Sequence, residues 1–427
     1  MYDSGSLKRK LMSAGFVCAD SGAQVAIINT CSVTKSAIRK NKQIANKAKK
    51  ENPGAKIILT GCWPKVYDVR AGDLGVDYVF RAGEEQKLVD KIKNFKTSNS
   101  KQVQNSKSEI QKICYTDNNS KNRSRYFIKI QDGCEQYCSY CVIPYARGKL
   151  KSRPEEEVIG EIKNAVDAGF REIVLSGVHI GLYGKDFNQI QSSKLKIQSR
   201  NPKLKIDLTG LIKKIIKIKN LGRVRISSIE VTEVGDELVE LIKGTDKVCD
   251  HLHISLQSGR DKILKSMNRP YSAEYFARRI KKLRKAIPDI AVSTDVIVGF
   301  PGETDADFKE TYDFCEKMEF SKIHVFSFSA HEKTPASKMG GQVSQEKIIE
   351  RSKKLRALSE KLEKRYKDKF NGAEAAVVIE GKNKNGLIRG KSEFYFDIEF
   401  DEAYLEKHGN TKYSDGIIGK ILNLPVV

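Results

Sequence analysis

The feature of this sequence that most constrains its fold is a strand-like run followed by a helix-like run, repeated six times between residues 125 and 340. A parallel connection between strands needs a crossover segment, which is usually a helix, so this alternation predicts an α/β fold with a parallel sheet. Six units are fewer than a closed barrel requires, so the expected form is a partial (β/α)6 barrel. The expected strands are Tyr126–Gln131, Glu172–Ser176, Arg223–Ser227, His251–Leu256, Ile290–Val298 and Lys322–Ser327.

Three cysteines, Cys134, Cys138 and Cys141, follow the first expected strand in the pattern C-x3-C-x2-C. A zinc site needs a fourth ligand and usually repeats C-x2-C pairs, and no further Cys or His lies close to this loop in the sequence. A [4Fe–4S] cluster held by three thiolates keeps one iron without a protein ligand, and that iron can take the amino and carboxylate groups of S-adenosylmethionine. The spacing therefore favours such a cluster over a zinc knuckle or three buried structural thiols.

Residues 1–95 also alternate apolar strands with charged helices, which predicts an open parallel α/β domain. Cys31 and Cys62 come directly after two of its expected strands, Gln24–Asn29 and Lys56–Thr60. Ligands of such sheets collect beyond the carboxyl ends of the strands. We therefore expect both cysteines at a ligand-binding edge of this sheet.

The remaining segments differ in composition. Residues 96–124 are polar and poor in apolar side chains, which is typical of a linker. A long basic helix is expected next to the barrel, and short strands separated by Gly and Asn turns then predict a small C-terminal β-barrel. The expected boundaries are 1–95 for the N-terminal domain, 96–124 for the linker, 125–345 for the partial barrel, 346–370 for the connecting helix and 371–427 for the small β-barrel.

The net charge of this chain is +23, which favours a polyanionic partner such as RNA. A generally lysine-rich proteome is the alternative explanation. The polar start of the chain and the lack of a long apolar run predict neither a secretory signal nor a membrane span. Nine cysteines in such a chain are typical of metal ligands and buried thiols in the reducing cytoplasm.

Taken together, these motifs resemble the radical SAM methylthiotransferases over essentially the whole chain. The three-cysteine loop is typical of radical SAM enzymes, as is Tyr140 just before its last cysteine. The resemblance implies an N-terminal methylthiotransferase domain, a radical SAM partial barrel and a C-terminal β-barrel called TRAM. The stretches that carry it are Ile28–Val33, Leu59–Cys62, Lys129–Cys134, Ile143–Gly148, His253–Gly259 and Asp295–Glu303.

Within this family, the stretch Leu175–Gly184 is similar to the branch that acts on N6-threonylcarbamoyladenosine beside the anticodon of tRNA. The branch that acts on isopentenyladenosine has a Gln-Asn-Val-Asn type sequence there, and a third branch modifies an aspartate of a ribosomal protein. The expected function is therefore methylthiolation of threonylcarbamoyladenosine. Those two other substrates, or a tRNA-binding protein unable to insert sulfur, are the alternatives.

The resemblance also implies the cofactors: two [4Fe–4S] clusters and S-adenosylmethionine. Cys134, Cys138 and Cys141 are expected to hold the first cluster, and Cys31 and Cys62 the auxiliary one. The family uses a 5′-deoxyadenosyl radical to remove hydrogen from adenine, and the auxiliary cluster supplies the sulfur. Expected partners are the tRNA anticodon stem-loop and an electron donor such as flavodoxin or ferredoxin; a monomer is expected, without membrane contact.

The sequence identifies no catalytic acid or base, but further cofactor contacts are expected at strand ends. Ser176 and Gly177 occupy the place where the family holds the amino group of S-adenosylmethionine. Tyr140 belongs to the cluster loop. For the residues at strand ends, a buried structural hydrogen bond is the alternative role. Arg147 is a candidate to pair with a carboxylate or phosphate. The later strand ends contribute Glu230, Ser255, Gln257 and Asp295.

The chain departs from the family pattern in two places. The family has three cysteines for the auxiliary cluster, and the missing one belongs to a stretch immediately before Tyr-Asp-Ser, which here follows Met1 directly. We therefore expect a natural protein with a longer N-terminus, or a genuine truncation, and Cys18 is expected to be a buried thiol. Phe328, His331 and Lys333 stand where relatives usually have Tyr, Arg and Gly.

Overall fold

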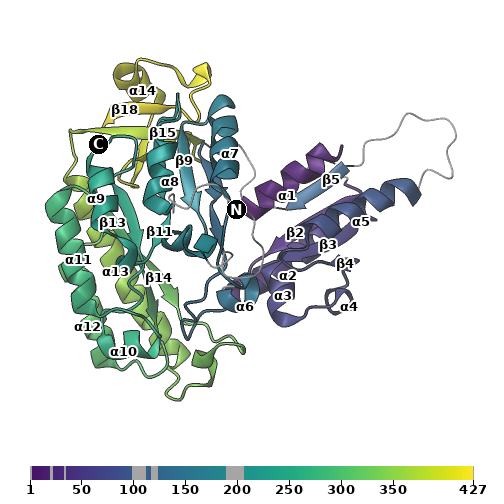
Figure 1. Cartoon of the computed structure of the whole chain (residues 1–427), viewed down its shortest axis with the longest axis horizontal. Coiled ribbons are helices and arrows are strands. Elements are labelled where there is room, and N and C mark those ends of the chain that lie inside the picture. Colours follow the sequence, from purple (N-terminus) through teal and green to yellow (C-terminus); the bar gives the residue numbers. More distant parts are fainter. Residues whose placement is uncertain are drawn as a thin grey trace.

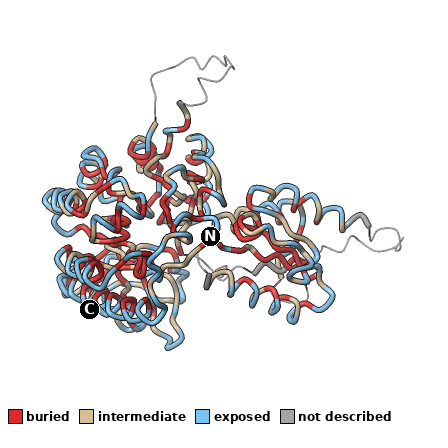
Figure 2. Tube along the Cα trace, turned by 90° about the horizontal axis from the view of Figure 1, so that it is seen from below, coloured by how far each residue is buried: buried red, intermediate tan, exposed pale blue. Residues whose placement is uncertain are grey.

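The computed structural model of this chain describes residues 2–19, 23–32, 35–98, 112–116, 124–188 and 206–426. Figure 1 shows an N-terminal sheet with its helices projecting from one side of a larger central body, and a small C-terminal sheet covering one end of that body. Buried residues follow the strands of each part, whereas the outer helices alternate between buried and exposed residues (Figure 2). None of the described helices is long and apolar enough to cross a membrane.

The N-terminal sheet is parallel and has helices on both faces. Neighbouring residues of β2 (Val25–Thr30) belong to different cores: Ile27 packs with Leu7 and Leu88, and Ile28 packs with Trp63. Successive side chains of a strand point to opposite faces, so both faces of this sheet are covered. The other strands are β1 (Val17–Cys18), β5 (Lys112–Thr116), β3 (Lys56–Gly61) and β4 (Tyr78–Val79), in the order β1-β5-β2-β3-β4. The helices are α1 (Tyr2–Ser13), α2 (Lys35–Glu51), α3 (Cys62–Tyr67), α4 (Ala71–Leu74) and α5 (Glu85–Ser98).

Strand β5 corrects the prediction that residues 96–124 form a linker throughout. It lies between β1 and β2, with Ile113 opposite Val25 and 1% exposed. Cys114, which also belongs to this strand, pairs in register with Ala26. The apolar run is short and its neighbours are polar, so the average composition of the segment hid a strand that long-range pairing stabilises.

The central body confirms the partial barrel, because each of the six expected strands has an observed counterpart. The third expected strand ends in a change of sheet at Ser227, between β10 and β11. The strands are β6 (Tyr126–Lys129), β9 (Glu172–Ser176), β10 (Arg223–Ile226), β11 (Ser228–Ile229), β12 (His251–Ile254), β13 (Ala291–Val298) and β14 (Lys322–Ser327), in the parallel orders β10-β9-β6 and β11-β12-β13-β14. Their outer helices are α7 (Glu155–Asp167), α8 (Leu208–Ile215), α9 (Asp236–Lys243), α10 (Asp261–Ser266), α11 (Ala273–Ala286) and α12 (Asp305–Met318).

Beyond the barrel, the long helix α13 (Gln345–Asp368) leads into an antiparallel sheet of four strands, which fits a small barrel. The strands are β15 (Glu374–Lys382), β16 (Ile388–Ser392), β17 (Asp397–Phe400) and β18 (Ile421–Pro425), in the order β17-β16-β15-β18, with α14 (Glu402–Gly409) between the last two in sequence. The sequence pattern predicts three strands here, Ala375–Glu380, Phe394–Phe400 and Gly416–Leu422. It does not indicate β16, and the last strand lies later than this pattern places it.

Buried charges join the C-terminal sheet to the barrel. Glu172 of β9 is fully buried, and its carboxylate accepts hydrogen bonds from Arg223 and Arg225 of β10 at 2.7 and 2.8 Å. Both guanidinium groups also donate to backbone carbonyls around β15 and β16, including those of Ala376 and Ser392. Burial by itself raises the pKa of Glu172, but the charges of Arg225 and Arg223 outweigh it and lower the pKa to about 2.

We expect Glu172→Gln to lower the free energy of unfolding by about 3–5 kcal/mol, because it removes the buried carboxylate that pairs directly with two buried guanidinium groups. Urea unfolding at pH 7 measures this loss. The pKa of Glu172 in the folded chain lies below its ordinary value of 4.5, so its contribution is present above that value and disappears as the pH falls towards about 2. Glu240→Gln, at an exposed position of α9, is the control; an equal loss there contradicts the prediction.

Candidate functional site

The cysteine loop lies at the carboxyl end of the first barrel strand, held between two short strands. Gly133 begins the loop after β7 (Gln131–Asp132), and the loop leads through α6 (Ile143–Arg147) to β8 (Lys151–Ser152). Gly133 has a φ of 72°, and a Cβ atom there would lie 1.9 Å from the carbonyl oxygen of Lys149. Only glycine therefore allows this close approach, which sets the path of the loop.

The three thiols of the loop are neighbours. Cys138 is buried, and the charges of Cys138 and Cys134 each contribute to raising the pKa of Cys141, whose largest cause is burial, to about 12. Two donors already point at the sulfur atoms: the backbone N–H of Gln136 lies 3.5 Å from Cys134 Sγ, and Arg269 Nη1 lies 3.3 Å from Cys138 Sγ. Donors of this kind suit thiolates, which is the state of a metal-bound cysteine.

This donor set fits an iron–sulfur cluster. As the side chains stand, no three Cys, His, Asp or Glu side chains among the described residues are arranged to hold a single metal ion. A [4Fe–4S] cluster does not require that arrangement, because each thiolate binds a different iron of the cluster. Three soft thiols on one loop, two of them with donors to sulfur, match what a cluster needs from the protein.

A pocket of about 190 Å³ opens beside the cysteine loop, at the carboxyl ends of β13 and β14. Its lining includes Tyr140, Gln257 and Asp295, three of the residues that the sequence singled out, together with Cys141. Asp295 lies 3.0 Å from Nε2 of His253 and accepts a hydrogen bond of 3.4 Å from Ser255. Three predicted cofactor contacts thus line this pocket, and a fourth, Ser255, is hydrogen-bonded to one of them, Asp295. Apolar walls come from Val142, Ile143, Ile297, Phe326 and Phe328.

The other three predicted contacts do not line this pocket. The Ser176 hydroxyl donates to the carbonyl of Ile128 at 3.0 Å, which ties β9 to β6. A Cβ atom at Gly177 would lie 2.7 Å from the carbonyl oxygen of Gln131, so this glycine permits a close backbone approach. The carboxylate of Glu230 is bound by the Arg269 guanidinium. Their expected contacts with S-adenosylmethionine stay predictions.

Cys31 and Cys62 lie where the sequence predicted, at the carboxyl ends of the neighbouring strands β2 and β3. Cys31 is exposed, and Cys62 is buried as the first residue of α3. Burial raises the pKa of the Cys62 thiol, and the charge of Cys31 adds to that effect, so the two thiols are close. A Cβ atom at Gly61, whose φ is 108°, would lie 2.4 Å from the carbonyl oxygen of Thr30, which shows how closely the two strand ends approach.

An apolar contact links this pair of cysteines to the cluster loop of the barrel. Cys62 and Val66 of α3 pack with Val142 and Ala146, which belong to the segment that directly follows Cys141. Both cysteine sites therefore border the same small core.

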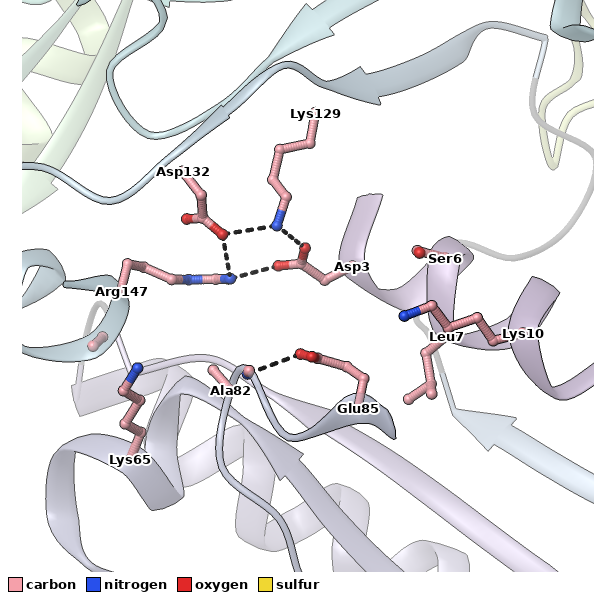
Figure 3. Close-up of a pocket in the computed structure, with 12 residues that line it drawn as sticks. Asp3, Ser6, Leu7, Lys10, Lys65, Ala82, Glu85, Lys129, Asp132 and Arg147 are labelled. Atoms are coloured by element: carbon pink, nitrogen blue, oxygen red, sulfur yellow. Dashed lines mark hydrogen bonds and ion pairs between the residues drawn. The ribbon is translucent and has the colours of Figure 1, made fainter. Parts of the chain in front are cut away.

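Charged residues reinforce this contact (Figure 3). Asp3 of α1 lies between Lys129 and Arg147, at 2.5 and 2.7 Å, and both cations also pair with Asp132. Burial by itself raises the pKa of Asp3, but the charges of Lys129 and Arg147 outweigh it and lower the pKa to about 2. Arg147 thus pairs with carboxylates of the chain itself, and its expected contact with a cofactor or substrate stays a prediction. The group lines a pocket of about 230 Å³ between the N-terminal sheet and the barrel.

A second contact between the two parts involves one of the family departures. His331, in the loop after β14, lies 2.5 Å from the hydroxyl of Tyr67 at the end of α3. Phe328 of the same loop lines the pocket beside the cysteines. Two of the three departures, Phe328 and His331, therefore lie at the pocket and at the contact with the N-terminal sheet.

A histidine that the sequence pattern does not indicate lies beside the cysteine loop. No His is near the loop in sequence, but the structure brings His179, from the loop after β9, to 3.5 Å from Cys134 Sγ. The backbone N–H of His179 donates to Gln131 Oε1 at 2.7 Å, which fixes its position. The approach joins residues 45 positions apart, so sequence spacing carried no signal for it.

We expect Asp3→Asn to weaken the docking of α1 on the barrel by about 1–2 kcal/mol, because the amide cannot replace the carboxylate between two cations. Amide hydrogen exchange in α1 should accelerate about 5- to 30-fold at pH 7. Since the pKa of Asp3 is about 2, below its ordinary 3.8, this docking persists in the wild type above that ordinary value and weakens as the pH falls towards 2. Unchanged exchange in α1 would contradict the prediction, and Asp90→Asn, exposed on α5, is the control.

Comparison with protein families gives two matches that follow the same division of the chain. Residues 128–315 match the radical SAM superfamily, and residues 1–80 match "Uncharacterized protein family UPF0004". A solved structure with a similar fold is the radical S-adenosylmethionine methyltransferase TsrM from Kitasatospora setae, with cobalamin and a [4Fe–4S] cluster bound. It has a TM-score of 0.52 and 14% identity, covering 78% of this chain and 68% of that chain.

Curated relatives match nearly the whole chain. Two are named "Threonylcarbamoyladenosine tRNA methylthiotransferase MtaB". The one from Bacillus subtilis is 35% identical over 100% of this chain and 91% of its own length. The one from Thermotoga maritima is 39% identical over 93% and 88%. A "tRNA-2-methylthio-N(6)-dimethylallyladenosine synthase" from Clostridium perfringens is 32% identical over 90% and 84%.

Proposed function

The chain belongs to the radical SAM methylthiotransferase family, and on that premise we propose that it inserts a methylthio group into the adenine of N6-threonylcarbamoyladenosine in tRNA. One observation carries this proposal: the similarity to relatives of that name spans both cysteine sites and the barrel between them. The geometry is consistent with it, because the cluster loop and the Cys31–Cys62 pair border one small core beside a pocket.

In this function, Cys134, Cys138 and Cys141 hold the radical SAM cluster. When bound, the cluster and S-adenosylmethionine supply the one-electron chemistry needed to replace an adenine C–H that is too weakly acidic for a side-chain base. Tyr140, Gln257 and Asp295 line the pocket in which cofactor and base have to meet. Its apolar walls exclude water, which protects a reactive intermediate from side reactions.

The N-terminal part supplies the sulfur in this proposal. Cys31 and Cys62 hold the auxiliary cluster of the family from the edge of their sheet. Asp3 and Arg147 fix α1 against the barrel, and the core around Val142 fixes α3 against α6. The sulfur source and the radical site are thereby held in a fixed relative position. The two sites therefore do not have to meet by diffusion.

Cysteine variants test the division of labour. The variant C134A/C138A/C141A should lose the cleavage of S-adenosylmethionine, because no ligands remain for that cluster. The variant C31A/C62A should still cleave S-adenosylmethionine but form no methylthio product. Both are measured by chromatography of the cleaved cofactor and mass spectrometry of tRNA nucleosides. Cys315→Ala, a buried thiol of α12, is the control and should keep both activities. Methylthio product from the C31A/C62A variant would rule out the proposed sulfur site.

The modified base is tested separately. The name of the Clostridium relative makes an isopentenyladenosine-type tRNA the second candidate. The stretch Leu175–Gly184 and the identities to the two relatives named for threonylcarbamoyladenosine favour the first. With both tRNAs offered, only threonylcarbamoyladenosine should gain the group; product on the isopentenyl base alone would overturn this substrate but not the family.

The anticodon stem-loop of tRNA is the proposed binding partner, with the target base taken out of its stack. Tyr137 and Tyr145, on and just after the cysteine loop, form an edge-to-face pair and are 53% and 40% exposed, which leaves their rings available for stacking on bases. A flavodoxin or ferredoxin is the proposed electron donor. We place the protein in the cytoplasm as a monomer, with domains divided as the sequence predicted and β5 added to the first.

We expect the affinity for tRNA to fall steeply with salt, because Lys and Arg contacts with phosphate release counterions. The double variant K149Q/K151Q, exposed beside the cysteine loop, should reduce the slope of log K against log salt by about 1.4, or about 0.7 per lost contact. Fluorescence titration at several salt concentrations measures the slope. K281Q/K285Q lies on α11, on the side of the barrel away from the N-terminal sheet (Figure 1), and should leave it unchanged. Equal slopes for the two variants would contradict this orientation of the tRNA.

A further inference from the structure

A buried chain of polar groups ends on one sulfur of the cluster loop. Glu233 Oε1 lies 2.5 Å from His179 Nε2, and His179 Nδ1 lies 3.5 Å from Cys134 Sγ. The histidine side chain is 6% exposed and that of the glutamate 10%, so water does not compete for these contacts. With a cluster bound, Cys134 is a metal-bound thiolate, so an acceptor faces each ring nitrogen and the ring donates to both.

The backbone holds the histidine in this place. The N–H groups of Val178 and His179 both donate to Gln131 Oε1, and the Gln131 side-chain amide donates to the carbonyls of Asp132 and Gly133, just before Cys134. The loop that carries His179 and the loop that carries Cys134 are thus joined through one buried amide. The approach of the ring to the sulfur is therefore part of the local fold and does not depend on the side chain alone.

A second chain runs in parallel from the same turn. Glu230 and Glu233 are the first and last residues of a capped turn, in which the N–H of Glu230 donates to the Glu233 carboxylate at 3.3 Å. Glu230 binds Arg269, whose Nη1 donates to Cys138 Sγ. One short turn therefore carries the two carboxylates that hold donors on two of the three cluster sulfurs.

Donors on a ligating sulfur change the energy of an electron on the cluster. A hydrogen bond to sulfur withdraws negative charge, which stabilises the reduced cluster and raises its reduction potential. A carboxylate behind a ligand-contacting histidine fixes the orientation and the proton position of the ring. In a buried site these effects are screened little.

We propose that His179, held by Glu233, is a positioning residue that donates to the Cys134 sulfur and raises the reduction potential of the cluster on Cys134, Cys138 and Cys141. This inference rests on the proposed function only in requiring a cluster at that loop. It adds a role that the motif of three cysteines does not contain. The chemistry it affects is the uptake of one electron by the cluster, without formation or cleavage of a bond to His179.

The test is a potentiometric titration of the full chain, reconstituted anaerobically in the C31A/C62A background so that one cluster dominates. Dithionite supplies the electron, and electron paramagnetic resonance reports the reduced fraction. His179→Gln should lower the ratio of reduced to oxidised cluster about tenfold at a fixed potential. This corresponds to a reduction potential about 59 mV lower, since one electron is transferred. Glu233→Gln, which keeps the ring, should shift the potential in the same direction by less. His251→Gln removes a buried histidine at the opposite end of a barrel strand and should cause no shift.

The outcomes separate this proposal from the proposed function. A parent protein that takes up no iron refutes the cluster and the function. A parent with a normal cluster, and a His179→Gln variant of equal potential and iron content, overturns the inference alone. If the His179→Gln variant does not load iron, the reduction potential of the Glu233→Gln variant is the test. An unchanged or raised potential in that variant also overturns the inference.

Discussion

The contact between α3 and α6 determines how the two cysteine sites face each other. Cys62 begins α3 and Cys141 precedes α6 by one residue, so the packing of Val66 on Val142 and Ala146 fixes both sites at once. The apolar contact alone does not fix the relative orientation of the N-terminal part and the barrel, because hydrophobic burial is not directional. Asp3, between Lys129 and Arg147, adds the direction, since ion pairs at 2.5 and 2.7 Å are lost with small displacements.

At the other end of the barrel, buried charge takes the same role. Arg223 and Arg225 reach from β10 into the C-terminal sheet, and both pair with the buried carboxylate of Glu172. The C-terminal sheet is attached at the amino ends of these strands, and the N-terminal part is attached beside the cysteine loop, at the end that carries the pocket. Because all the barrel strands run parallel, the cysteine loop and the pocket lie together at one end and the C-terminal sheet lies at the other.

Sequence alone predicted what depends on local pattern. The barrel strands, the connecting helix α13 and the positions of both cysteine sites at strand ends follow from periodicity and spacing, and the structure has them. It did not predict β5 or β16, whose pairing partners lie far away in the chain, nor the contacts of His179, Glu233 and Arg269 around the cysteines. Those contacts join residues 39 to 131 positions apart, and such distances leave no mark in spacing. The cofactor roles of Ser176, Gly177 and Glu230 were predicted from their positions at strand ends. In the structure, the Ser176 hydroxyl and the Glu230 carboxylate make contacts within the protein.

The two cysteine sites differ in exposure in a way that suits different chemistry. Cys138 is buried and its sulfur already receives a donor from Arg269, so the surroundings of that cluster are provided by the protein. An electron reaches a buried centre without the entry of a reagent, so burial does not prevent turnover there. Cys31 is exposed at the edge of its sheet. A cluster that gives up sulfur has to be resupplied by a reagent that arrives through solvent, so an exposed ligand is what the proposed sulfur source requires. On the proposed assignment, the fold keeps the electron-accepting site inside the barrel and the sulfur-giving site at an open edge, with one small core between them.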